Sequence, residues 1–268
     1  MVLKLVESDE LEIHSFLHNV KSQDNHTIPL LDQVALETKT IIVMPDERML
    51  RDVPLLDFKA SGNDIAHQFL EGVRHMHKNK IAHLDLKPDN IYVAITTSPL
   101  RLHISDYGVS LQVDTEESWV KGYCGTEGWT APEVQDKQYQ PILADLWSAG
   151  RVLQYIAHCQ HADTNSSSPF EYESLANKLV HRNPLERPRL SNIVLSHECP
   201  PNLLLKRKRG IDKQENEVER IWFPSGRPPL SNIDRDNESP PILPLKRKRG
   251  VDKQENEQPL VSLPLPMP

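Results

Sequence analysis

The chain has 268 residues, of which 26% are charged and 38% hydrophobic, and its formal net charge is −7. This predicts one large globular domain or two small ones, and the acidic balance argues against nucleic-acid binding over the whole surface. Three scattered cysteines argue against a disulfide framework and favour a reducing compartment. No apolar run is long enough to span a bilayer, and the N-terminus turns acidic too early for a signal peptide. We therefore expect an intracellular protein, nuclear or cytoplasmic, with no membrane partner.

The first 45 residues predict short alternating elements. "MVLKLV" is typical of a strand, and "SDELEIHSFLHNV" predicts a helix with Ser8 as its N-cap and acids in its first turn. "TIPLLDQVALETKTIIVMP" predicts two strands around a polar turn. We expect these elements to form one small unit.

From about residue 46 the pattern becomes mainly helical. "SGNDIAHQFLEGVRHMHKNK" places five apolar residues on one helix face: Ile65, Phe69, Leu70, Val73 and Met76. "NIYVAI" and "LRLHISD" predict short strands, and "ILADLWSAGRVLQYIAHCQ" and "FEYESLANKLVHR" predict further helices. Strands first and helices afterwards indicate an α+β fold.

After about residue 198 proline, serine, asparagine and charged residues dominate, which predicts a disordered tail over 199–268. The segment from Arg187 is repeated from Arg227, and two copies are too few for a solenoid, so a local duplication explains them. Each copy carries "KRKR", at Lys206–Arg209 and Lys246–Arg249, which resembles a nuclear import signal, although a solvated charge run is the plain alternative. The acidic "DKQENE" that follows each block argues against direct nucleic-acid binding.

Two stretches carry groups suited to phosphoryl transfer. In "HLDLKPDN", Asp85 can orient an attacking hydroxyl, Lys87 can neutralise the transferred phosphoryl group and Asn90 can hold a metal ion. In "ISDYGVS", sixteen residues beyond Asn90, Asp106 offers a second metal ligand. Gly108 is expected to give the backbone freedom there.

Together with "GTEGWTAPE", "DLWSAG" and "NPLERPRL", these stretches resemble the eukaryotic protein kinases, in the family's order and approximate spacing. The match covers roughly residues 1–198 and is also similar to kinase-like proteins of mushroom-forming fungi. It implies a bilobal kinase-like fold with a partial small lobe (1–45) and a mainly helical large lobe (46–198). It also implies ATP and Mg²⁺ as cofactors and a protein as substrate.

The resemblance assigns further residues. It places Lys4 at the nucleotide-binding lysine, with Glu10 as its partner acid and Glu12 as the alternative. Met44 would be the gatekeeper, and Pro45 and Asp46 would open the hinge that receives adenine. Structural and substrate-positioning roles fall to His83, Thr126, Glu133, Asp145 and Arg187, with Glu133 pairing with Arg187 and Asp145 binding the catalytic-loop backbone. Lys87 with Thr126 resembles Ser/Thr rather than Tyr kinases.

Two departures from the family pattern matter. Leu84 replaces the arginine that precedes the catalytic aspartate, and Gly122 occupies the usual phosphate-acceptor position, which together suggest an activation segment ordered without phosphate. Thr115 and Ser118 are other possible acceptors. A Gly-rich loop is missing, as in a family member that lacks the first two strands, so impaired activity is expected. The hypotheses are a Ser/Thr protein kinase, a non-catalytic kinase-like binding module, and, less favoured, a small-molecule phosphotransferase.

Overall fold

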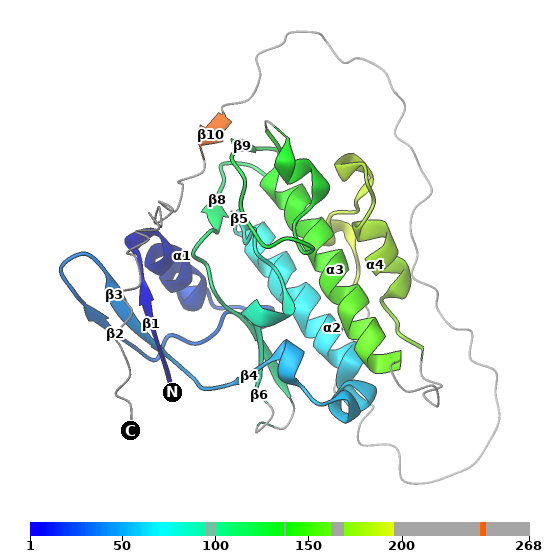
Figure 1. Ribbon diagram of the computed structural model, residues 1–268, viewed down its shortest axis with the longest axis horizontal. Coiled ribbons are helices and arrows are strands. Elements are labelled where there is room, and N and C mark those ends of the chain that lie inside the picture. The colour runs from blue at the N-terminus through cyan, green and yellow to red at the C-terminus, as the bar shows by residue number, and fades with distance from the viewer. Residues whose placement is uncertain (95–96, 98–99, 137, 162–168, 196–241, 245–268) are drawn as a thin grey trace, which may run out of the picture.

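The computed structural model describes residues 1–94, 97, 100–136, 138–161, 169–195 and 242–244 (Figure 1). It is an α+β, two-lobed arrangement, with the small lobe and its helix α1 at the left of Figure 1 and helices α2, α3 and α4 at the right. The helices are α1 (Ser8–Asn19), α2 (Leu55–Lys78), α3 (Pro141–His161) and α4 (Glu173–Leu179). The strands are β1 (Val2–Val6), β2 (Asp32–Ala35), β3 (Thr40–Met44), β4 (Arg48–Met49), β5 (Ile81–Ala82), β6 (Ile91–Ala94), β7 (Arg101–Ile104), β8 (Leu111–Gln112), β9 (Trp119–Lys121) and β10 (Ile242–Pro244). Single 3-10 turns span Leu50–Asp52, Pro88–Asn90, Pro132–Gln135, Pro184–Glu186 and Leu190–Asn192.

The small lobe is an antiparallel sheet in the order β1-β3-β2, so β1 is an edge strand. One face of the sheet packs inward and buries Val6, Ile42 and Met44. On the other face Leu3 and Leu5 are exposed, because side chains alternate along a strand. The inward face also carries Lys4, two residues before Val6, and so aims this lysine toward α1.

Helix α1 buries Glu10, His14 and Leu17, which lie on one face at spacings of four and three residues. Apolar residues alone do not identify this buried face. Phe16 is 42% exposed, whereas the carboxylate of Glu10 and the imidazole of His14 point inward. Ser8 is the first helical residue and not the N-cap. Glu7 holds the N-cap position without a side-chain cap bond.

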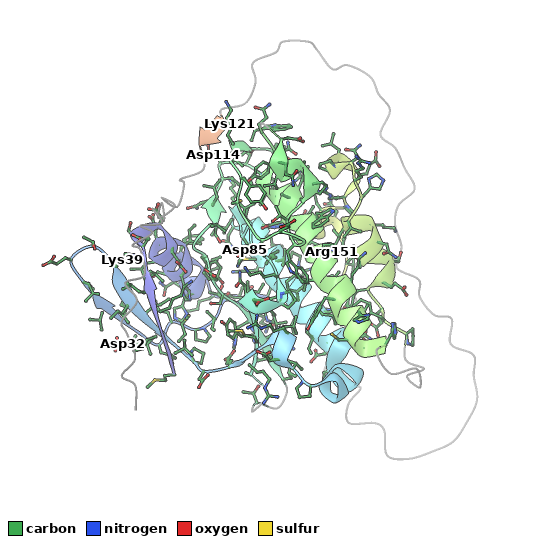
Figure 2. The ribbon with its side chains drawn as sticks, viewed as in Figure 1. Asp32, Lys39, Asp85, Asp114, Lys121 and Arg151 are labelled. Atoms are coloured by element: carbon green, nitrogen blue, oxygen red, sulfur yellow. The ribbon has the colours of Figure 1, made fainter. Side chains whose placement is uncertain are left out.

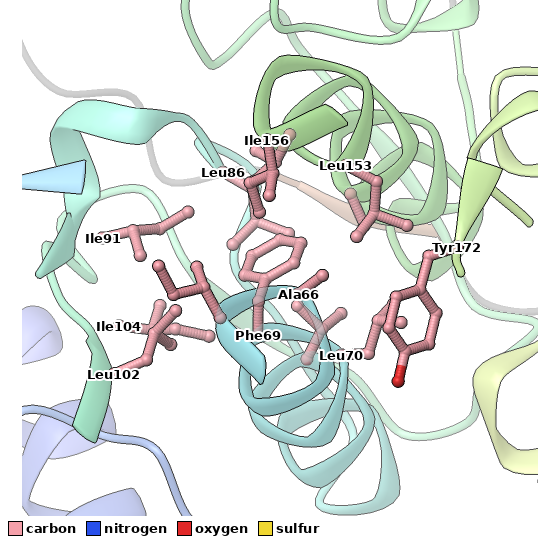
Figure 3. Close-up of a cluster of buried hydrophobic side chains, with 14 of the residues drawn as sticks. Ala66, Phe69, Leu70, Leu86, Ile91, Leu102, Ile104, Leu153, Ile156 and Tyr172 are labelled. Atoms are coloured by element: carbon pink, nitrogen blue, oxygen red, sulfur yellow. The ribbon is translucent and has the colours of Figure 1, made fainter. Parts of the chain in front are cut away.

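The large lobe is built on α2 and α3, which pack against each other (Figure 3). All five residues of the predicted apolar face of α2 are buried, and they contact buried leucines and isoleucines of α3 and the β6–β7 hairpin. Each fully buried side chain of this kind contributes about 1.5–3 kcal/mol. This core holds the hairpin rigidly, and the site residues follow its strands.

The loop between α1 and β2 joins the lobes. The amide of Ile104 donates to the carbonyl oxygen of His26 at 2.6 Å, and the amide of Ile28 donates to the carbonyl oxygen of Ile104 at 2.9 Å. The imidazole of His26 is buried between the carbonyl oxygen of Leu102 and the carboxylate of Glu71 on α2. The position of α1 is therefore tied to β7 and α2 of the large lobe.

The two "KRKR" segments lie outside the described residues, as does most of the tail. Within the tail, β10 pairs in parallel with β9, with Leu243 opposite Val120. Among the described residues, no helix has both the length and the apolar character needed to cross a membrane.

Candidate functional site

The catalytic-loop candidates lie between β5 and β6, on a backbone fixed by Asp145 of α3. The amide of His83 donates to Asp145 Oδ2 at 2.5 Å and the amide of Leu84 donates to Oδ1 at 2.7 Å. His83 is fully buried, and its Nε2 donates to the carbonyl oxygen of Ser105 at 2.9 Å. One buried carboxylate thus holds two consecutive amides and sets the turn that precedes Asp85.

Asp85, labelled in Figure 2, accepts hydrogen bonds from three neighbouring side chains. Thr126 Oγ1 donates to Asp85 Oδ1 at 2.7 Å, and Lys87 Nζ donates to Asp85 Oδ2 at 2.9 Å and to Thr126 Oγ1 at 2.6 Å. Asn90 Nδ2 donates to the backbone oxygen of Asp85 at 2.8 Å and to its Oδ2 at 3.1 Å. Residues from the loop and from the segment 41 positions later therefore converge on one carboxylate.

Lys4 reaches across from the small lobe. Its Nζ lies 2.8 Å from Asp106 Oδ1 and also contacts Glu10 Oε1. Burial by itself lowers the pKa of Lys4, but hydrogen bonds to Asp106 and Glu10 outweigh it and raise the pKa above its ordinary value. Of the two candidate acids, Glu10 makes the contact, whereas Glu12 is exposed. The lysine thus joins β1, α1 and the segment after β7.

Asn90 and Asp106 flank the same end of the β6–β7 hairpin. Ile91 lies opposite Ile104 in the ladder, and the amide of Ser105 donates to the carbonyl oxygen of Asn90 at 2.9 Å. Asp106 has φ 66°, in the left-handed region. The predicted backbone freedom of Gly108 is wrong, because Gly108 has no positive φ and the unusual conformation falls on Asp106 instead.

Tyr107 lies between two imidazoles in tilted ring contacts that sequence reasoning missed. Its ring centroid lies 5.2 Å from that of His14 on α1 and 5.5 Å from that of His83. Its hydroxyl donates to the carbonyl oxygen of Ile104 at 2.8 Å, and burial raises its pKa. These ring contacts connect α1 to the loop that carries Asp85. Their only sequence signal was an aromatic residue next to Asp106.

The three hinge candidates, Met44, Pro45 and Asp46, do not line one common cleft. Met44 is buried among Val6, Ile28 and Ile42. Asp46 lines a cleft of about 500 Å³ beside β4 and β6, but Met44 and Pro45 do not line it. Tyr92 of β6 packs against the Met44 cluster, and burial raises the pKa of its phenol. Sequence reasoning did not predict this contact of Tyr92. The alternation along β6 was its only signal, because Ile91 and Val93 point into the large-lobe core and Tyr92 points to the opposite side.

Glu133 and Arg187 are brought together at the far end of the site. Arg187 Nη2 lies 2.9 Å from Glu133 Oε2, and Nη1 contacts Oε1. The arginine side chain is fully buried and also donates to two backbone oxygens, those of Leu143 and His181. The pair anchors the end of the segment that contains Thr126.

A family model described as a protein kinase domain matches residues 21–174, more than half of the chain. The chain belongs to the protein kinase family. The matched range contains the Asp85 loop, Asp106, Thr126 and Glu133, but not Lys4, Glu10 or Arg187, whose placement rests on the contacts above.

Curated relatives include several protein kinases. The chain is 41% identical over 110 residues to a titin homolog of Caenorhabditis elegans, covering 41% of this chain and 1% of that protein. It is 30% identical over 159 residues to the serine/threonine-protein kinase RAD53 of Saccharomyces cerevisiae, covering 51% and 19%. It is 28% identical over 138 residues to calcium/calmodulin-dependent protein kinase type II of C. elegans, covering 50% and 19%. The chain therefore spans a fifth or less of the length of these relatives.

Proposed function

We propose that the chain acts as an ATP- and Mg²⁺-dependent protein Ser/Thr kinase. The observation that carries this proposal is the position of Lys4, whose ammonium contacts Glu10 and Asp106 together. A lysine held by an acid of the neighbouring helix and directed at a metal-binding carboxylate can hold the α- and β-phosphates of a nucleotide. An isolated surface lysine on an edge strand has no reason to be so held.

The groups around the β6–β7 hairpin fit a divalent cation. Asn90 uses its amide nitrogen as donor in both bonds to Asp85, so its Oδ1 remains suited to be a metal ligand. Asp106 adds a carboxylate at the same end of the hairpin, and magnesium favours oxygen ligands of this kind. Bound Mg²⁺ would neutralise charge on the nucleotide phosphates.

Asp85 and Lys87 are suited to the acceptor side of the reaction. The carboxylate of Asp85 can orient a substrate hydroxyl and accept its proton, while the Lys87 ammonium faces the charge that develops on the transferred group. Both contact Thr126, whose hydroxyl occupies the place next to the acceptor. The presence of Lys87 with Thr126 supports Ser/Thr as acceptor.

A non-catalytic binding module is the second candidate, favoured by the small lobe. No glycine precedes Gly62 in the sequence, and β1 is an edge strand among the described residues. Residues 1–61 therefore do not themselves supply the backbone donors of a Gly-rich loop. From these residues alone, weak nucleotide binding and slow transfer are expected.

We further propose the division into a partial small lobe (1–45), a large lobe (46–198) and a tail (199–268), with Met44–Asp46 contributing backbone groups to adenine. Import into the nucleus through the two "KRKR" segments is a proposal on sequence alone. Limited proteolysis tests the division, because a protected fragment extending well beyond residue 210 contradicts it.

The kinase proposal is tested by thermal-shift titration with ATP, with and without Mg²⁺, alongside a phosphate-transfer assay on a Ser/Thr peptide mixture. Asp106→Ala should remove the Mg²⁺-dependent part of the shift, because it removes the metal ligand altogether. Asp85→Asn should keep the shift and lose transfer, because this carboxylate orients the acceptor. Asp32→Asn, an exposed carboxylate on β2, is the matched control. A parent protein with no Mg²⁺-dependent shift at millimolar ATP rejects the kinase proposal and leaves the binding module.

A further inference from the structure

Leu84 is buried among residues of the segment that follows Asp106. It is 5% exposed, although it stands in a loop otherwise rich in polar side chains. It belongs to a hydrophobic cluster distinct from the α2–α3 core, and its other buried members are Ala82, Val113, Val120, Ala131, Val134, Tyr139, Ile142 and Ala144. We call this group the Leu84 cluster, and we call residues 106–133 the activation segment.

Backbone bonds attach the activation segment on both sides of this cluster. Before it, Ala82 pairs with Leu111 in the β5–β8 ladder, and the amide of Val113 donates to the carbonyl oxygen of Lys80 at 2.8 Å. After it, Val120 and Tyr139 exchange two bonds of 2.9 and 3.0 Å. Val113 and Val120 therefore enter the cluster from two separately anchored stretches, and the Leu84 side chain packs in the same cluster.

The backbone of Leu84 is also held in a fixed conformation. Its φ of 65° turns the chain, and its amide is held by Asp145. Its carbonyl oxygen lies 2.8 Å from the place where a Cβ on Gly125 would be, so the activation segment crosses directly over it. Thr126, which bonds Asp85, is the next residue after that crossing. A shift of Leu84 is thereby transmitted to both sides of the acceptor site.

We propose that Leu84 is a positioning residue whose apolar contacts hold the activation segment so that Thr126 reaches Asp85, without any phosphorylated side chain. Contacts of this kind carry no charge, so removing phosphate leaves them unchanged. Burial also raises the pKa of Cys124, which packs on the cluster, to about 11, in keeping with an apolar surrounding. The inference deepens the proposed function, because it concerns how the same site is assembled.

The hydroxyls of the segment support a phosphate-independent assembly. Ser118 is buried, and its Oγ accepts a bond from the amide of Thr115 at 3.1 Å. A phosphate on Ser118 would lose this bond and would add negative charge beside Glu116 and Glu117. Both glutamates already pair with Arg189. Phosphate at this turn is thus expected to loosen the segment.

The test is tryptic cleavage after Lys121, an exposed residue at the end of β9 (Figure 2), measured on the full chain below its unfolding temperature. Leu84→Ala should raise this cleavage rate roughly tenfold or more, because a cavity in the cluster frees the segment. Leu84→Met, similar in volume, should restore the parent rate. Val120→Ala should act in the same direction as Leu84→Ala.

Two controls separate positioning from general destabilisation. Ile156→Ala creates a cavity in the α2–α3 core and should lower Tm without preferential cleavage at Lys121. Leu185→Ala, at a leucine that is 76% exposed, should change neither. Phosphatase treatment of protein from a eukaryotic host should leave the parent rate unchanged. Parent-like cleavage of Leu84→Ala, or faster cleavage of the parent after phosphatase, overturns the inference.

The cleavage readout does not depend on catalysis. If the parent fails the Mg²⁺–ATP thermal shift but cleavage follows the expected order, the proposed function fails and the positioning role of Leu84 stands. If the parent transfers phosphate, Leu84→Ala should lower kcat and raise KM for the peptide while leaving the Mg²⁺–ATP shift unchanged. Loss of the nucleotide shift in that variant argues against a role confined to the acceptor side.

Discussion

Arg187 and Glu133, 54 positions apart in the sequence, form a two-pronged ion pair in which the arginine side chain is fully buried. Two further bonds of the guanidinium go to the carbonyl oxygens of His181, from Nε, and Leu143, from Nη1. A planar guanidinium can satisfy a carboxylate and two carbonyls together, which a lysine ammonium cannot do in the same geometry. The end of the activation segment is therefore fixed to the start of α3 and to the turn after α4.

Replacing Arg187 by Lys should destabilise the chain by about 1–3 kcal/mol, because the charge remains but the partly buried carboxylate of Glu133 and two carbonyl oxygens lose well-placed donors. Chemical denaturation measures the change. Arg189→Lys is the matched control, since its pair with Glu116 is partly exposed and should cost under about 1 kcal/mol. Equal losses in the two variants would show that the buried pair is no more important than the surface one.

Local sequence order was enough to predict the parts of the site whose geometry is set by neighbours in the chain. Asp85, Lys87 and Asn90 lie within six residues, and the strand that follows their loop was predicted from "NIYVAI". The strand before the loop, β5, has only two residues and was not predicted. The order of the kinase motifs along the chain then predicted the distant partners of this loop, Thr126 and Asp145. The buried face of α2 was also predictable, because the apolar residues of this 24-residue helix form one regular stripe that must face the core.

The buried face of α1, the conformation of Asp106 and the burial of Leu84 depend on tertiary contacts and could not be predicted from local sequence. Helix α1 turns Glu10 and His14 inward because Lys4, the Ile28 carbonyl oxygen and Tyr107 compensate their burial. The family resemblance predicted the Lys4–Glu10 pair, whose members are close in sequence, but the partners of His14 come from other parts of the chain. The φ of Asp106 is likewise set by its surroundings and not by glycine preference. Leu84 could be recognised in the sequence as a departure, but its burial against Val113 and Val120 required the fold.

Lys4→Met should destabilise the chain by about 1–3 kcal/mol, because Glu10 is 8% exposed and would lose its counter-charge. The double variant with Glu10→Gln should regain much of that stability but should not regain the Mg²⁺–ATP thermal shift. Lys39→Met, which breaks an exposed pair with Glu7, should stay within about 0.5 kcal/mol of the parent. A double variant that binds nucleotide as the parent does would remove Lys4 from the site.

His14 should make stability fall as the solution becomes mildly acidic. Burial lowers the pKa of this imidazole, with smaller contributions from nearby His18 and Lys4, whereas its bond to the Ile28 carbonyl oxygen acts in the opposite direction. The folded state thus favours the neutral ring. As pH falls through about 6.5 the unfolded state takes up the proton first, so stability is lost on the acid side.

The measurement is Tm at pH 7.5 and pH 5.5 for the parent and His14→Phe. The phenylalanine keeps a ring beside Tyr107 but cannot titrate, so its drop in Tm between the two pH values should be smaller than the parent's. At pH 7.5 the variant should be less stable by about 1 kcal/mol, because the Ile28 carbonyl oxygen loses its donor. Exposed His158→Phe is the control, and a parent-like drop in His14→Phe would contradict the assignment.

Gly125 and Gly128 offer a matched pair for the crossing over Leu84. Both have positive φ, 93° and 81°, so alanine at either position carries a backbone cost of about 1–2 kcal/mol. Only at Gly125 would the new Cβ also meet other atoms, with Thr130 Oγ1 at 2.5 Å and the carbonyl oxygen of Leu84 at 2.8 Å, whereas nothing lies within 4 Å at Gly128.

Gly125→Ala should therefore lower Tm further than Gly128→Ala and should alone accelerate cleavage at Lys121. The loop backbone at Leu84 is held by Asp145 through the Leu84 amide, so moving the loop is costly and the strain should displace the activation segment. Equal effects of the two substitutions on Tm and on cleavage would mean that the crossing is loose, and that Thr126 is not held against Asp85 by this contact.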